Sequence, residues 1–166
     1  MVAEDLGVQS PEVENLRRQE GLPGMQVLEF SLIDNGTPRA GAQAEENCVV
    51  YTGTHDNNTA AGWFLHDLNE WTRPRVGEYL GISPDDTPDR AAMAMIREAY
   101  YSRAGIAIVP VQDILGLGKE ARMNIPGEAK GNWRWRMKKG ALTGEQAEWL
   151  RELAEKTGRR GSCLGR

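Results

Sequence analysis

The sequence predicts an α/β fold built on a parallel sheet, and two observations lead to that prediction. Short apolar runs that suit buried strands, such as Val49–Thr52 and Ile106–Val111, are separated by segments with helical periodicity. Strands that alternate with helices along a chain favour parallel pairing with right-handed crossovers. With 166 residues, the chain is long enough to form one domain with a substantial core.

The first expected elements are a strand, a helix and a second strand. Met1–Ala3 predicts the end of a strand, and because strands usually have about five or six residues, we expect the chain to begin inside one. Ser10 is expected to cap a helix that ends at Gly21. Met25–Leu32 is expected to be the second strand, and residues 33–47, rich in Gly, Ala, Pro and Glu, an irregular loop.

The segment that follows the central strand, Val49–Thr52, is expected to be largely helical. Asn57 or Asn58 can cap a helix that runs to about Glu70. Residues 72–88 contain three prolines and predict a short helix within loops.

A long helix and the last strand come next. Pro88 is expected to begin a helix with an apolar face, and Gly105 to end it. The run Ile106–Val111 is nearly all apolar, which predicts a strand covered on both faces.

The final helix is expected to begin at Thr143 with a capping box that Gln146 completes. It should end near Gly158 and bury its apolar residues Ala147, Leu150, and Leu153 or Ala154. We therefore expect residues 1–157 to form the domain and residues 158–166 to be a disordered tail.

Composition excludes several classes of function. The net charge of −4 offers no basic surface for phosphates, so nucleic acid is not an expected partner. Cys48 and Cys163 lie far apart without a CxxC motif, which predicts reduced thiols and a cytoplasmic protein. No apolar run approaches the roughly 18 residues of a membrane span, so no membrane association is expected.

A dense polar cluster follows the central strand, and it is the strongest functional signal in the chain. Residues 54–58 read Thr-His-Asp-Asn-Asn directly after Gly53. Ligand sites of α/β sheets and barrels lie at the carboxyl ends of the strands, which is where this cluster is expected. A simple helix cap is the alternative, but a cap needs one such residue and five stand together here.

Two other motifs suggest nucleotide or metal chemistry but lack the required context. Residues 116–121 fit the GxGxxA dinucleotide fingerprint, yet Pro126 follows too soon for the helix that this motif opens. Glu120 stands where a P-loop has Ser or Thr after its lysine. His55 and His66, the only histidines, are eleven residues apart without a Cys/His cluster. We predict no cofactor and no metal.

Carboxylate chemistry at one rim of the sheet explains the polar residues best. Glycosyl transfer needs a protonated acid for the leaving oxygen and negative charge beside an oxocarbenium-like transition state. Glu4, Asp56, His55 and Asn124 are all expected at strand ends on the same rim. Amide and imidazole groups suit sugar hydroxyls, and exposed tryptophans suit the apolar faces of sugars.

Four motifs together resemble the 4-α-glucanotransferases, also called amylomaltases or disproportionating enzymes. The motifs are AEDLG at 3–7, GLPGMQVLEF at 21–30, VVYTGTHDN at 49–57 and ARMNIPG…GNWRWR at 121–136. The resemblance extends to about Thr157. These are retaining enzymes that act on α-glucans and have a (β/α)₈ barrel. The resemblance therefore implies that the chain is the C-terminal half of a TIM barrel. It would contain the last four strands and be truncated within the first of them.

The resemblance also implies roles for individual residues. Glu4 matches the general acid/base of the family, and Asp56 the carboxylate that grips the sugar ring and stabilises the transition state. His55 would contact the same sugar, and Asn124 a sugar on the donor side. Asp34 matches an acidic loop residue that contacts substrate.

Two departures from the family pattern limit what the resemblance implies. Residues 35–46 lack the aromatic loop with Pro-His-Asn-Tyr that serves the acceptor side. The nucleophilic aspartate of the family belongs to an Arg-x-Asp-His type motif on the strand before AEDLG, and nothing in this chain matches it.

The implied function is therefore transfer of α-1,4-glucan segments between maltodextrins by a retaining double displacement, with the chain inactive when alone. The alternative is a non-catalytic half-barrel that binds glucan or a partner chain. Expected partners are maltooligosaccharides and the missing N-terminal half of the barrel. Exposed strand edges also predict self-association.

Overall fold

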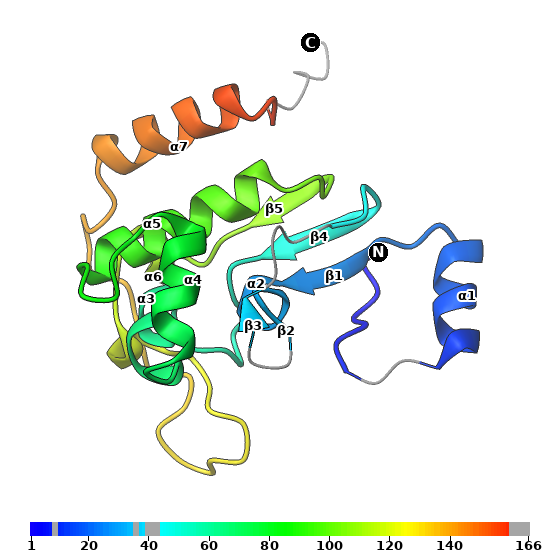
Figure 1. Cartoon of the computed structure of the whole chain (residues 1–166), viewed down its shortest axis with the longest axis horizontal. Helices are drawn as coiled ribbons and strands as arrows, with labels where there is room; N and C mark the ends of the chain where they lie inside the picture. The colour runs from blue at the N-terminus through cyan, green and yellow to red at the C-terminus, as the bar shows by residue number, and fades with distance from the viewer. Residues whose placement is uncertain (8–9, 35–36, 39–43, 160–166) are drawn as a thin grey trace.

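The centre of the molecule is a parallel sheet of three strands. The computed structural model of the chain describes residues 1–7, 10–34, 37–38 and 44–159. The strands β1 (Gly24–Val27), β4 (Cys48–Tyr51) and β5 (Ile106–Ile108) lie in the order β1-β4-β5 (Figure 1). Val49 of β4 is paired with Met25 of β1 and Ile106 of β5, both in parallel. The predicted α/β class with a parallel sheet is confirmed.

One face of this sheet carries the hydrophobic core. The helices α3 (Ala60–Gly62), η1 (Trp63–Asp67), α4 (Thr72–Leu80) and α5 (Pro88–Tyr101) gather on this side of the molecule (Figure 1). The core cluster joins Val50 of the sheet to fully buried helical side chains, which include Phe64, Val76 and Met95. Because side chains alternate along a strand, the neighbours of Val50 face the other way.

The opposite face of the sheet is open at β5. Ile106 is 51% exposed and Ile108 is 45% exposed, so the prediction of a strand covered on both faces is wrong for this chain. The strand is also shorter than predicted. Pro110 cannot donate to a ladder, and α6 (Val111–Ile114) begins directly after it.

The N-terminal segment packs beside β1 without being a strand, so the predicted strand at Met1–Ala3 is wrong. The Ala3 amide donates to the carbonyl of Pro23, and the Asp5 carboxylate accepts from the Met25 amide at 2.6 Å. Asp5 also lies 3.3 Å from Arg17. These contacts occupy polar groups at the outer edge of β1.

The first helix agrees with the sequence at its start. α1 (Pro11–Gln19) is capped by Ser10, whose hydroxyl accepts from the Val13 amide, and acidic residues fill its first turn. It ends at Gln19, and Gly21 adopts the left-handed conformation in the turn that follows.

The expected second strand, Met25–Leu32, divides into two elements. β1 stops at Val27, and the single turn α2 (Leu28–Ser31) follows. Leu28 and Leu32 are both fully buried, and the Leu32 amide donates to the carbonyl of Leu28 at 2.9 Å, which is the hydrogen bond of a helical turn.

The expected loop over residues 33–47 contains a small hairpin. β2 (Ile33–Asp34) pairs antiparallel with β3 (Thr37–Pro38), so the loop prediction is wrong at these four residues. Most of the remaining loop, 35–36 and 39–43, lies outside the described residues.

Asn57 or Asn58 is predicted to cap the helix after β4, but the cap is Thr59. The Thr59 hydroxyl accepts from the Gly62 amide at 3.0 Å. Asn58 instead bonds the Thr59 amide through its side-chain oxygen and donates its amide to Asp67 at 3.1 and 3.2 Å. The helix widens to π geometry and ends at Asp67, before the predicted Glu70.

α4 confirms the short helix expected within residues 72–88, and α5 begins at Pro88 as predicted. The end of α5 is four residues earlier than Gly105. Ser102 is the C-cap, and its hydroxyl donates to the carbonyl of Ala99.

The last helix, α7 (Gly144–Lys156), lies beside α5 and above the rest of the fold in Figure 1. The capping box of Thr143 and Gln146 is confirmed. Leu153 is buried as predicted, whereas Ala147 is exposed. Within the described ranges, no helix is both long and apolar enough to cross a membrane.

Arg159 fastens the C-terminal end of this helix to the end of α5. Its guanidinium donates to the carbonyls of Tyr100, Ser102 and Ala104, each at 2.7 Å. Carbonyls at a helix C-terminus have no intrahelical partners, and a cation there is favourable. The predicted disordered tail is therefore wrong at Gly158 and Arg159, and its remainder, 160–166, lies outside the described residues.

Arg159→Ala is expected to lower the free energy of unfolding by about 1–3 kcal/mol, because several carbonyls lose a charged donor at once. Chemical denaturation followed by circular dichroism measures this change. Arg75→Ala removes an exposed arginine of α4 and is the matched control, with an expected effect within about 0.5 kcal/mol. Equal stability of the two variants would contradict the anchoring role of Arg159.

Candidate active site

The polar cluster lies where predicted, at the carboxyl end of the central strand. β4 leads through Thr52 and Gly53 into the turn of residues 54–57. A hollow of about 660 Å³ opens beside this turn and extends over the open face of the sheet. Its lining includes the two predicted catalytic carboxylates, Glu4 and Asp56, and the neighbouring His55. Tyr51 of β4 and Ile108 of β5 also line it.

The turn is built by its own side chains. Asn57 Oδ1 accepts from both the amide and the hydroxyl of Thr54, at 2.9 and 2.7 Å. The Thr54 hydroxyl in turn accepts from the Asp56 amide at 3.3 Å. Such side-chain bonds to a nearby backbone are typical of Asx and Ser/Thr turns. The cluster is therefore not a helix cap, because Thr59 caps the helix that follows.

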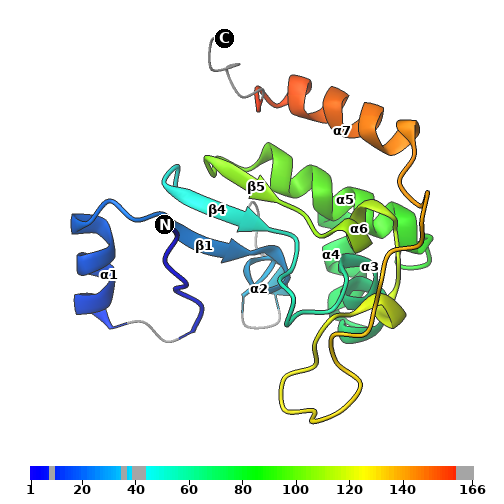
Figure 2. The ribbon, with the colours of Figure 1, turned by 180° about the vertical axis from the view of Figure 1, so that it is seen from behind.

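A distant segment docks on this turn and brings the predicted residues together. Asn124 Nδ2 donates to Asp56 Oδ1 at 2.5 Å, and the Asn124 amide donates to the carbonyl of His55 at 3.1 Å. Arg122 donates to the carbonyls of Asp56 and Asn124, at 2.7 and 2.9 Å. Figure 2 shows this loop, which follows η2 (Lys119–Ala121) and is drawn in yellow, beside the turn after β4.

His55 lies between a carboxylate and an aromatic ring. Its Nε2 is 3.4 Å from Asp56 Oδ1, and its ring centroid is 5.2 Å from that of Trp133. Among the described residues, Trp133 is the only non-glycine residue with a positive φ, at 62°. A bulky residue in this region is strained and persists only where its surroundings hold it.

The loop that carries Trp133 supplies that restraint. The Trp133 amide donates to the carbonyl of Met123 at 2.7 Å. The neighbouring Asn132 closes the loop with its side chain, which bonds both backbone groups of Ile125 and the carbonyl of Glu128. Sequence reasoning did not foresee this conformation, although Gly131 and Asn132 just before the tryptophan are turn-forming residues.

Two buried carboxyl groups lie beneath the turn, and neither was predicted. Asp113 of α6 is 1% exposed and accepts from the Thr52 hydroxyl at 2.6 Å and the Ala60 amide at 2.8 Å. Burial raises the pKa of Asp113, and the two hydrogen bonds oppose that rise. No local pattern marks these contacts, because they join residues more than fifty positions apart.

Glu29 of α2 is the second buried carboxyl group, and it is 6% exposed. Burial raises its pKa to about 9, and the negative charges of Asp113 and Asp67 add to the rise. Its Oε1 lies 2.7 Å from the position that a Cβ on Gly53 would occupy. Gly53 is therefore required for close approach to this acid.

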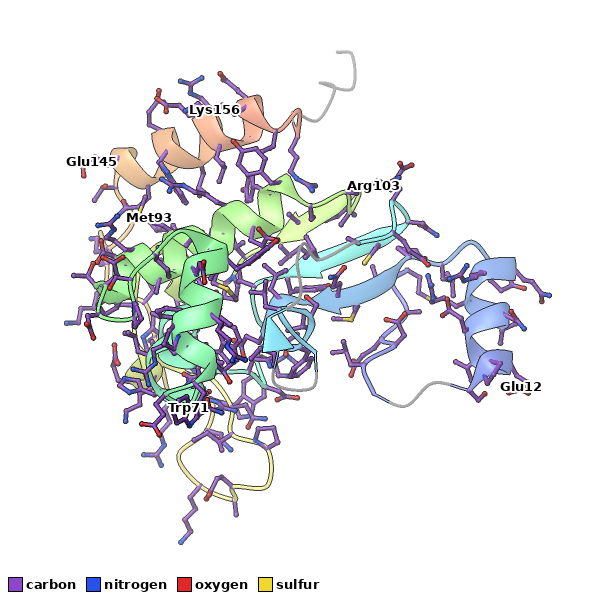
Figure 3. The ribbon with its side chains drawn as sticks, in the orientation of Figure 1. Glu12, Trp71, Met93, Arg103, Glu145 and Lys156 are labelled. Atoms are coloured by element: carbon purple, nitrogen blue, oxygen red, sulfur yellow. The ribbon has the colours of Figure 1, made fainter. Side chains whose placement is uncertain are left out.

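The remaining predicted site residues are less closely held. Glu4 is exposed and lines the hollow. The backbone of Asp34 belongs to β2, and its side chain lies outside the described part of the chain. Of the tryptophans, Trp71 is exposed at the start of α4 (Figure 3), while Trp133 is 49% exposed and contacts His55. The described residues contain no group of three or more His, Cys, Asp or Glu side chains that could hold a metal.

Comparison with known proteins places this site in a family. A family model described as 4-alpha-glucanotransferase matches residues 1–143. The chain belongs to the 4-α-glucanotransferase family. It is 45% identical to the 4-α-glucanotransferase of Synechocystis sp. over 162 residues and 43% identical to that of Thermus thermophilus over 165 residues.

These relatives are much longer than this member of the family. Each alignment covers 96% of this chain but only 31% and 33% of the two relatives. The fold agrees with that of the amylomaltase from Streptococcus agalactiae in complex with acarbose, with a TM-score of 0.86 at 30% identity. That match covers 96% of this chain and 32% of the amylomaltase.

Gly53→Ala is expected to lower the free energy of unfolding by about 1–3 kcal/mol, because the added methyl group meets Glu29 Oε1 and, at 3.3 Å, the carbonyl of Asn58. Thermal and chemical denaturation measure the loss. The control is Gly144→Ala at the start of α7, where a Cβ meets nothing within 4 Å and stability should be unchanged or slightly higher. A Gly53→Ala variant as stable as this control would refute the close approach.

Proposed function

We propose that this chain is the C-terminal part of the catalytic barrel of a 4-α-glucanotransferase, which transfers α-1,4-glucan segments between maltodextrins. The observation that carries the proposal is the cluster of Asp56, His55 and Asn124, formed where the segment after η2 docks on the turn, at the rim of a hollow that Glu4 also lines. Family membership supports the reaction type, and the acarbose complex of the Streptococcus agalactiae amylomaltase supports a glucan-like ligand.

Each residue has a distinct part in this chemistry. Glu4 acts as the general acid that protonates the leaving oxygen and then as the base that deprotonates the acceptor hydroxyl. Asp56 stabilises the positive charge that develops on the sugar ring. Its contacts with Asn124 and His55 are both made at Oδ1, so the carboxylate can offer Oδ2 to the sugar. Asn124 and His55 also bind sugar hydroxyls, and Asp34 contacts substrate from its loop.

A retaining reaction needs a second carboxylate as nucleophile, about 5–5.5 Å from the acid/base. We propose that the remaining part of a full-length barrel supplies it. The open face of the sheet at Ile106 and Ile108 is the surface on which that part would pack, and the length of the relatives is consistent with it. When that part is absent, the edge strand β5 favours self-association. The reaction requires no cofactor, and we place it in the cytoplasm.

The chain alone is expected to neither transfer nor hydrolyse α-1,4-glucan at a detectable rate, because no glycosyl-enzyme can form without the nucleophile. Co-expression with the N-terminal part of the Thermus thermophilus relative should restore disproportionation of maltotriose, measured as glucose release. Glu4→Gln should abolish the restored activity, and Glu70→Gln, at an exposed glutamate before α4, should not. Transfer by the purified chain alone would overturn this division of the catalytic residues.

The chain should bind acarbose at the hollow, and tryptophan fluorescence should report this because Trp133 lies against His55. Asp56→Ala and Asn124→Ala are each expected to weaken binding by about tenfold or more, since each removes one partner of the 2.5 Å hydrogen bond. Asp85→Ala, an exposed aspartate between α4 and α5, is the control. Unchanged affinity in both site variants would remove these residues from the site. Binding without restorable transfer would favour a non-catalytic, glucan-binding half-barrel.

A further inference from the structure

Glu29 is a buried ionisable side chain that lies directly beneath the turn and has no role in the proposed chemistry. It is two residues beyond the end of β1, on the single turn α2, and this position carries its carboxyl group under Gly53. It is 6% exposed and is not among the residues that line the hollow. We therefore expect it to act on the site through the residues of the turn.

Asn57 connects Glu29 to the turn that carries His55 and Asp56. The side-chain oxygen of Asn57 already accepts two hydrogen bonds from Thr54, so its amide group remains to donate. The Asn57 side chain lies close enough to the Glu29 carboxyl group to lower its pKa. The two side chains meet around Gly53: Glu29 Oε1 is 2.7 Å and Asn57 Cβ 3.2 Å from where a Gly53 Cβ would be. Asn57 is thus hydrogen-bonded to Thr54 and packed beside Glu29.

We propose that Glu29 is a positioning residue of the active site: its buried carboxyl group holds Asn57, and through Asn57 the turn that presents His55 and Asp56. The link to catalysis rests on the proposed function. The link between Glu29 and the turn rests only on the contacts described here.

The charges around Glu29 make this hold sensitive to alkaline pH. Asp113 of α6 and Asp67 of η1 face it with negative charge, and Arg122 beyond η2 faces it with positive charge. With a pKa of about 9, the carboxyl group is protonated at neutral pH. Above that pH, Glu29 carries a buried negative charge beside Asp113. Glu29 Oε1 has no hydrogen-bond partner in the described structure to stabilise this charge.

The sign of the effect on stability follows from proton linkage. An unfolded glutamate titrates near its ordinary value of 4.5, whereas the folded carboxyl group keeps its proton to about pH 9. Folding therefore takes up a proton between these values, and stability falls as pH rises through that window. Glu29→Gln removes the titration, so its melting temperature should rise relative to the unmodified chain, and increasingly so from pH 5 to pH 8.

Amide hydrogen exchange tests the hold on the turn directly. The Thr54 amide donates to Asn57 Oδ1 and should be protected at neutral pH in the unmodified chain and in Glu29→Gln, whose amide is isosteric with the protonated acid. Glu29→Ala should lose about tenfold of this protection, equivalent to one lost hydrogen bond. Glu70→Gln is again the control. Protection in Glu29→Ala within twofold of the unmodified chain would overturn the proposal.

A pH titration keeps the proposal testable if Glu29→Ala does not fold. The carboxyl ¹³C signal of Glu29 and the side-chain amide signals of Asn57 should titrate together near pH 9, and the Asn57 shift should vanish in Glu29→Gln. A Glu29 midpoint below pH 6, or Asn57 signals that do not follow it, would overturn the proposal.

Acarbose affinity separates this proposal from the proposed function. The affinity of the unmodified chain and of Glu70→Gln should fall about tenfold between pH 8 and pH 10, as expected for a mostly released turn, while that of Glu29→Gln should not. Parallel loss in Glu29→Gln would overturn the catalytic link. Coupled titration of Glu29 and Asn57 without any acarbose binding would support the hold on the turn and count against the proposed function.

Discussion

The structure at the carboxyl edge of the sheet depends on the two hydrogen bonds that Asp113 accepts. One comes from Thr52 at the end of β4 and the other from Ala60 at the start of α3, so a single buried carboxyl group joins a strand to two helices. In a buried environment each of these donors would be costly to leave unpaired. The turn that carries His55 and Asp56 spans the short interval between these two fixed points.

These hydrogen bonds also explain why the turn keeps an ordered conformation although it is rich in polar residues. Both ends of the segment from Thr52 to Ala60 are anchored to α6, and the middle is closed by Asn57 and by Arg122. The Glu29 carboxyl group, with a pKa of about 9, is protonated at neutral pH and adds no negative charge beneath the turn.

The location of the site could be predicted from sequence, whereas its supports could not. Val49–Thr52 followed by a polar cluster is a local pattern, and it correctly indicated the carboxyl end of a buried strand. Residue type does not predict the choice of Thr59 over Asn57 and Asn58 as cap, because all three can cap a helix. Side-chain hydrogen bonds decide it: Asn57 accepts from Thr54, and Asn58 donates to Asp67.

The same limit accounts for the buried acids. Glu29 lies in a segment whose composition suits a strand, but the pairing with β4 stops at Val27 and a helical turn follows. Asp113 follows an apolar run that predicts a strand to Val111, but β5 ends at Ile108 and α6 begins at Val111. Resemblance to a family identified residues expected to touch sugar, but it gave no information on the residues beneath them.

The contacts of Arg159 fix the position of the last described residue on the fold. Its contact with Ala104 lies just before β5, at the amino ends of the strands, and Arg103 marks the same region in Figure 3. The hollow is at the other end of the same sheet. A reporter group attached at Arg159 itself would thus lie at the opposite end of the sheet from the hollow and would leave the candidate site uncovered.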